Sequence, residues 1–387
     1  MDNPSKKARP KFIKAGLITL LALAMSMVLA APFTASTGAV FSTSEQSDYS
    51  ITDFYNYVAN NRALSYLDDN IVIVNIDRSD RYEIAEILNL LTLLGPKGVG
   101  LDVTFEDVRE GDSVLLDAIF STPNIVQPIS LQPIAGTDSF YVESASYFFD
   151  PEHPEGFSGS GLPSKYHNSM VREMKTNFPT RGVGNVPSFA VALAEIADPD
   201  AVVRLNERGK DLEVISFYSR RFRIYEPYEI VDNADEFTGR LVFIGAMSER
   251  GDLHPTPIET LTPGVVIHAH AAAAILGGRY LNTINNWLEL ALSALLCYGI
   301  VLLNVSCRKK GRPFWMRLIQ VGCVIILVFG GYYLFINHYI SVNVTAGLLM
   351  ITFGLFASDI YLGIEGIFMD HKISQYRKRL KDLNNKL

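Results

Sequence analysis

Long apolar runs with few charges occupy four places along the chain, one near its beginning and three near its end. The first covers residues 12–33, and the later ones cover residues 287–305, 314–336 and 340–362. Each is close to the roughly 20 residues that an α-helix needs to cross a bilayer. The pattern therefore predicts one N-terminal and three C-terminal transmembrane helices.

Two interpretations of the first run remain open. It can be a retained signal-anchor helix, since it is long enough to span a bilayer. It can also be a signal peptide that is cleaved, because Val28, Leu29 and Ala30 end in a small-residue pattern. We favour the retained anchor. Under both interpretations the basic residues 1–11 stay in the cytoplasm and the following residues are exported.

Basic residues between the runs predict the orientation of the helices. The 306–313 segment contains four Lys or Arg residues and the 363–387 tail is also basic, whereas the 337–343 segment contains none. Because Lys and Arg are enriched in cytoplasmic loops, we expect the 306–313 segment and the tail to be cytoplasmic. Residues 34–283 then lie outside. Buried helices of a large soluble protein would not show this sided charge pattern.

The exported region begins with a strand, a helix and a second strand. Residues 70–77 form a β-branched run typical of a strand buried on both faces. Asp80 can cap the amphipathic segment that follows it, and Gly95-Pro96 ends that segment. Residues 98–105 predict the next strand. A βαβ unit of this kind implies two parallel strands.

Further elements continue this α/β pattern. Residues 188–197 predict a helix, residues 212–218 and 240–245 predict strands, and Pro263-Gly264 opens an alanine-rich helix. Residues 130–185, rich in Pro, Gly, Ser and Tyr, predict an irregular insertion. We therefore expect an α/β extracytoplasmic domain with a mainly parallel sheet, in addition to the transmembrane α-helices.

Charge and cysteine content exclude several classes of function. Residues 42–283 contain 35 Asp and Glu but 18 Lys and Arg, so this region repels nucleic acid. The cysteines Cys297, Cys307 and Cys323 all lie in the C-terminal hydrophobic region, and no spacing suggests zinc. We expect no nucleic-acid partner, no disulfide framework in the outer domain and no cofactor.

Five short blocks carry a resemblance to a known family. They are residues 74–79, 100–106, 239–246, 251–257 and 263–271, which read VNIDRS, GLDVTFE, GRLVFIGA, GDLHPTP and PGVVIHAHA. Their order and their place between one N-terminal and three C-terminal hydrophobic segments resemble the type-2 CHASE domain. That domain is an extracellular sensory module associated with cyclases and histidine kinases. The resemblance covers roughly residues 44–362.

The resemblance implies a multi-pass protein of the bacterial inner (cytoplasmic) membrane that perceives a small-molecule or protein signal outside. Relatives often continue into a kinase or cyclase, whereas residues 363–387 alone follow the last run here. We therefore expect no enzymatic activity and expect a separate cytoplasmic or membrane protein to receive the signal. Homo-oligomers are compatible with this interpretation. The alternatives are a structural or assembly component of an envelope complex and, less favoured, an ectoenzyme.

Candidate ligand-binding residues follow from the positions of the strand ends. Ligands of open α/β sheets bind beyond the carboxyl ends of the strands. The residues at or after such ends, or in the blocks that follow them, are Asp77, Asp102, Phe105, Asp252, His254 and Thr256. The alternative is that the aspartates cap helices or order loops.

The sequence gives little support for a metal site, a nucleotide site or a catalytic site. His268 and His270 are two positions apart, so on a helix they point to different faces and cannot bind one metal together. The glycine-rich residues 181–185 lack the Lys-Ser/Thr of a P-loop. No signature of a serine hydrolase or metalloprotease occurs. We expect no metal site and no catalytic residues.

The tail has two interpretations. Its apolar positions lie among basic residues, at Ile367, Phe368, Ile373, Tyr376, Leu380 and Leu383. They are compatible with a helix that extends the last span and pairs with a copy or with another protein. They are equally compatible with a solvated basic tail on anionic lipid.

Overall fold

The computed structural model describes residues 10–39, 51–61, 66–160, 170–217, 220–308, 313–342 and 344–384. The chain divides into two compact units. The first, residues 48–282, is called the α/β unit here. The second, residues 1–47 together with 283–387, is called the helical unit. Residues 1–9 of the expected cytoplasmic N-terminus and residues 309–312 of the expected cytoplasmic loop lie outside the described residues.

A nine-stranded sheet forms the centre of the α/β unit. Its order is β10-β1-β11-β2-β3-β4-β7-β8, and β5 pairs with β3. The strands of the main path are β10 (Arg220–Tyr225), β1 (Tyr66–Asn75), β11 (Leu241–Gly245), β2 (Gly98–Leu101), β3 (Ile125–Pro133), β4 (Phe140–Ser144), β7 (Asn177–Thr180) and β8 (Gly184–Pro187), with β5 at Phe157–Gly159. The pairs from β10 to β3 are all parallel, and β3–β4 and β7–β8 are antiparallel. The expected α/β class with a mainly parallel sheet is confirmed.

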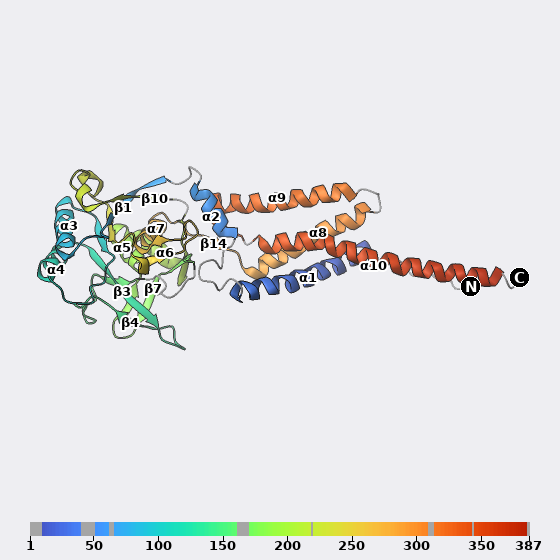
Figure 1. Ribbon diagram of the computed structural model, residues 1–387, viewed down its shortest axis with the longest axis horizontal. Helices are drawn as coiled ribbons and strands as arrows, with labels where there is room; N and C mark the ends of the chain where they lie inside the picture. Colours follow the sequence, from blue (N-terminus) through green and yellow to red (C-terminus); the bar gives the residue numbers. More distant parts are fainter. Residues whose placement is uncertain are drawn as a thin grey trace. The chain divides into compact units, whose positions relative to one another are not determined.

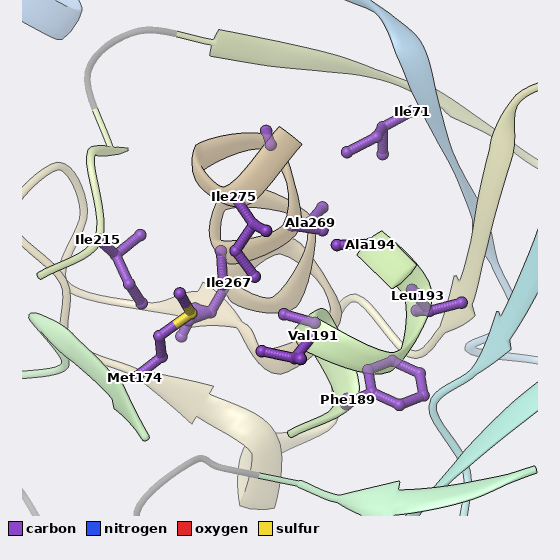
Figure 2. Packing of buried hydrophobic residues seen from close by; sticks show 14 of the residues in the cluster. Ile71, Met174, Phe189, Val191, Leu193, Ala194, Ile215, Ile267, Ala269 and Ile275 are labelled. Carbon is purple, nitrogen blue, oxygen red and sulfur yellow. The ribbon is translucent and has the colours of Figure 1, made fainter. Parts of the chain in front are cut away.

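Helices cover both faces of this sheet, giving three layers (Figure 1). On one face, α3 (Arg81–Leu94) and α4 (Asp112–Ser121) pack against Val72 and Val74 of β1. On the other face, α5 (Phe189–Ala197), α6 (Pro199–Glu207) and α7 (Gly264–Leu276) pack against Ile71 and Ile73. Figure 2 shows this second core, in which Val191 and Ala194 lie on the side of α5 that faces α7. Residues 71–74 of β1 have no exposed surface, which explains their uninterrupted β-branched sequence.

Local signals set the ends of α3 as expected. The Asp80 carboxylate accepts a hydrogen bond from the Glu83 amide, and the Glu83 carboxylate accepts one from the Asp80 amide. This capping box satisfies two amide groups that the helix cannot pair internally. Gly95 follows the helix with φ of 66°, a left-handed conformation that costs glycine little.

Three expectations for the α/β unit are corrected. The predicted strand 212–218 is shortened to β9 (Leu212–Val214), which pairs with β6 (Glu173–Lys175) outside the main sheet, and Tyr218 lies outside the described residues. The predicted strand 98–105 ends at Leu101 as β2. The predicted irregular insertion 130–185 instead contains strands β4 to β8, although its residues 161–169 lie outside the described part of the chain.

Four helices of the helical unit are long and apolar enough to cross a membrane. They are α1 (Lys11–Ala39), α8 (Asn286–Arg308), α9 (Pro313–His338) and α10 (Thr345–Asn384). Helices α1, α8 and α10 share a buried core that includes Ile18, Val301 and Met350. The expected number and order of apolar helices are confirmed.

The last of these helices differs from its predicted span at both ends. It begins at Thr345 and not at residue 340, because Ile340 and Ser341 are extended as β15 (Ile340–Ser341). It continues without a break to Asn384, so the tail is helical as far as the structure describes it. The predicted helical extension of the last span is confirmed, whereas its pairing with another helix stays a prediction, and residues 385–387 lie outside the described residues.

Candidate functional site

Asp77 binds the loop that follows β11. Its carboxylate accepts hydrogen bonds from the backbone amides of Met247 and Ser248, at 2.7 and 2.8 Å. Burial by itself raises the pKa of Asp77, but the hydrogen bonds from Ser248, Met247 and Asn75 outweigh it and lower the pKa below its usual value. Asp77 is therefore held as a carboxylate that orders this loop.

Asp102 lies where β2 ends, beside the first turn of α7. Its amide donates a hydrogen bond to the Ile244 carbonyl of β11 at 2.8 Å, which fixes the backbone at the edge of the sheet. Its Oδ2 atom lies 4.0 Å from Nε2 of His268, a buried residue of α7. The sheet order β1-β11-β2 thus brings the strand end and the helix together.

Asp252 and His254 complete a cluster with these two residues. His254 Nε2 lies 3.5 Å from Asp252 Oδ1, and Asp252 Oδ2 accepts a hydrogen bond from the Gly264 amide at 3.2 Å. A Cβ atom on residue 264 would collide with the Asp252 carboxylate, so glycine is required for this close approach. We call Asp102, Asp252, His254 and His268 the edge cluster.

Two groups of the edge cluster, Asp102 and His268, have pKa values that are shifted in opposite directions. Burial raises the pKa of Asp102 well above its usual value, and the negative charges of Asp252 and Glu249 raise it further. Burial lowers the pKa of His268 to about 4, since the attraction of Asp252 only partly compensates. Both shifts favour the neutral forms of Asp102 and His268. The cluster can exchange neutral and charged states when a charged group approaches it.

A cavity of about 550 Å³ opens beside the same strand ends. It is lined by residues that follow Asp77 and Asp102 in the chain and by the start of α3, including Ser79, Arg81, Thr104 and Phe105. The cavity has both arginines and carboxylates on its walls. A volume of this size is typical of small-molecule sites, and the mixed charge suits a polar ligand.

The fold brings some of the six candidate residues together and separates the others from them. Asp102, Asp252 and His254 come together in the edge cluster, and Asp77 contacts the loop after β11. Phe105 instead stacks on Phe148, with ring centroids 6.4 Å apart, in the core around α3 and α4. Thr256 is fully buried in the turn between β12 (Leu253–His254) and β13 (Thr262–Pro263), where its hydroxyl lies 2.8 Å from that of Thr262.

His268 was not predicted as a ligand-binding residue. It lies in the first turns of α7, within the sequence block 263–271. Its neighbour His270 points elsewhere, toward the rings of Phe217 and Phe222 at 5.2 and 4.9 Å. The two histidines are therefore separated, as their spacing on a helix requires. Within the described residues, no group of three or more His, Cys, Asp or Glu side chains has an arrangement suited to a metal ion.

Comparison with known proteins identifies the family. The family model of the CHASE2 domain matches residues 23–303, which is most of the chain. No curated protein and no solved structure matches the chain. CHASE2 domains are extracellular sensory domains, in agreement with the resemblance of the five sequence blocks. The chain belongs to the CHASE2 domain family.

Proposed function

We propose that this chain is a transmembrane sensor subunit. Its α/β unit perceives a signal outside the cytoplasm, and the three C-terminal helices relay it to a separate protein. Membership of a family of extracellular sensory domains supports the first part. The continuity of α10 supports the second part and is the observation that carries the proposal.

Helix α10 gives the relay a physical basis. It is one helix of 40 residues, about 60 Å long, that packs against α1 and α8 and then continues beyond them. The Lys14 ammonium forms an ion pair with Glu365 at 2.5 Å, which ties α1 to α10 near the end of their contact. Because a helix is stiff, a shift or rotation of its bundled part is passed on to its free end.

The edge cluster and the adjacent cavity are the proposed point of signal entry. A ligand shifts a conformational equilibrium only if it binds two states differently. A charged group that enters the cavity changes the balance between the neutral and charged forms of Asp102 and His268. This change alters contacts at the start of α7, which packs on one face of the sheet together with α5 and α6.

The proposal is tested by crosslinking the tagged full chain in its own cells and purifying it. We expect a membrane or cytoplasmic protein to copurify, with a yield that changes in Asp102→Asn. Asp117→Asn, a matched change on the exposed side of α4, should leave the yield unchanged. A stoichiometric complex insensitive to both changes would indicate an assembly component. Recovery of no partner under any condition would contradict the relay.

A further inference from the structure

The end of α10 is a free helix. Every side chain from residue 366 to 378 is exposed, and the helix continues to Asn384 (Figure 1). No glycine or proline interrupts it after Gly366. Most of the stability of a helix in a protein comes from the packing of an amphipathic face. A partner that packs along this exposed segment would therefore stabilise the helix.

Apolar positions along this segment follow a heptad repeat. Met369, Ile373 and Tyr376 are spaced by four and three residues, and Leu380 and Leu383 continue the alternation. Met369, Ile373 and Tyr376 are 60%, 46% and 52% exposed. Alternating spacing of this kind is the pattern of a coiled-coil seam. We call these five positions the tail seam.

The charges beside the tail seam oppose pairing with a second copy. In this register Lys372 and Arg379 occupy g positions, and Arg377 occupies an e position. Two copies inserted in one membrane have tails that run in the same direction, so they would pair in parallel. A parallel pair brings each g residue next to the following e residue of the other helix. Lys372 would then face Arg377 twice, and like charges at these positions disfavour the pair.

A lipid surface fits the tail seam less well than a protein helix does. Asn384 lies about 28 Å beyond Glu365 along the helix axis, because each residue advances the helix by 1.5 Å. The attraction of anionic lipid decays within a Debye length of roughly 8 Å. With the last span ending at residue 362, as the sequence predicts, a helix that continues straight carries most of the seam past this range.

We propose that the tail seam docks an amphipathic helix of another protein whose seam is flanked by Glu and Asp. The charge of the flanking positions identifies this occupant, since acidic e and g residues complement Lys372, Arg377 and Arg379. The inference rests on the proposed function for the direction of the tail, and it defines the chemistry of the receiving protein.

Binding of two synthetic heptad peptides to the purified full chain tests this docking. Both peptides carry Ile and Leu at the seam, one with Glu and one with Lys at every e and g position. Fluorescence anisotropy in a non-ionic detergent should show that the Glu peptide binds at least about tenfold more tightly than the Lys peptide. The double variant Lys372→Glu, Arg377→Glu should reverse that preference. Ile373→Asn should weaken binding of the Glu peptide at least about tenfold.

A matched control changes the same charge away from the seam. Lys378→Glu with Lys381→Glu alters f and b positions and should leave both affinities within about threefold of the original chain. An equal loss of binding in the control pair would show unspecific attraction and overturn the proposal. Equal affinity for the two peptides would overturn it as well.

Oxidative crosslinking in membranes tests whether a second copy of this chain covers the tail seam. Tyr376→Cys, combined with Cys307→Ser, should give no rapid disulfide between tails. Rapid crosslinking would show that a copy of this chain covers the seam and would overturn the proposal. Neither measurement depends on the outer unit, so failure of the docking would leave the sensor test with Asp102→Asn unaffected.

Discussion

Burial favours the neutral form of Asp102 at the edge of the sheet. Because burial and the charges of Asp252 and Glu249 raise its pKa, the folded chain binds the Asp102 proton more tightly than the unfolded chain does. The resulting stabilisation is complete below the unfolded pKa of about 3.9 and is lost as the pH rises through the folded pKa.

We expect Asp102→Asn to remove this loss. Relative to the original chain, the free energy of unfolding of the variant should rise as the pH increases from 4 toward neutral, by about 1.4 kcal/mol per unit of pKa shift. Thermal unfolding followed by circular dichroism over this pH range measures the difference. The exposed change Asp117→Asn serves as control, and parallel curves for all three chains would contradict the assignment.

His270 makes the opposite contribution. Burial and, to a smaller extent, the positive charge of Arg279 lower its pKa to about 3. The stability linked to His270 is complete above the unfolded pKa of about 6.5 and decreases as the pH falls toward 3. Its Nδ1 atom also has no hydrogen-bond partner among the described residues, so its polarity is not compensated.

His270→Phe should therefore flatten the acid side of the stability profile. At pH 5 the original chain should have lost about 2 kcal/mol through this group, while the phenylalanine variant retains it. Urea unfolding at pH 7.5 and pH 5 measures both values. The matched change His153→Phe, at an exposed residue, should leave the pH dependence as it is. The same acid loss in His270→Phe would rule out this residue as the cause.

At the scale of elements, the start of α3 is set by residues that lie close together in the chain. Its capping box depends on Asp80 and Glu83, which are three residues apart in the chain. Asp80→Ala should destabilise the α/β unit by about 1 kcal/mol, because one amide of the first turn loses its acceptor. Asp80→Ser should retain most of the stability, since a hydroxyl also caps. Thermal unfolding of both variants is the measurement, and equal losses would argue against the cap.

Strand β10 could not be predicted from its local sequence. Its sequence, RRFRIY, is too basic to predict a strand of the main sheet, yet it pairs with β1 and forms the edge of that sheet. Arg220 lies 3.4 Å from Asp68, and Arg223 lies 3.6 Å from Asp69, so acidic residues of β1 compensate its charge. That compensation exists only after the two strands pair, and no window along the chain contains both.

At the scale of the whole molecule, the orientation of the helices is the expectation with the widest consequences. A membrane-impermeant thiol reagent applied to intact cells should label His338→Cys, at the last residue of α9, and should not label the native Cys307. Permeabilised cells should show labelling at Cys307. The physical reason is the concentration of basic residues beside Cys307 and their absence near residue 338. Labelling of Cys307 in intact cells would invert the proposed topology.

The sequence alone determined the features that depend on neighbours in the chain. A run of apolar residues spans a bilayer wherever it occurs, so the four long helices were predictable, as were the buried strand β1 and the cap of α3. The five sequence blocks were likewise sufficient to indicate the CHASE2 family.

The tertiary structure alone decided which residues meet. Asp102 and Asp252 are far apart in the chain, and they approach each other only because β11 inserts between β1 and β2 and is followed by the β12–β13 turn and α7. The same strand order separates Phe105 and Thr256 from the edge cluster. It also places β10 next to β1. Strand order results from long-range pairing and core packing, which no local pattern of apolar and polar residues contains.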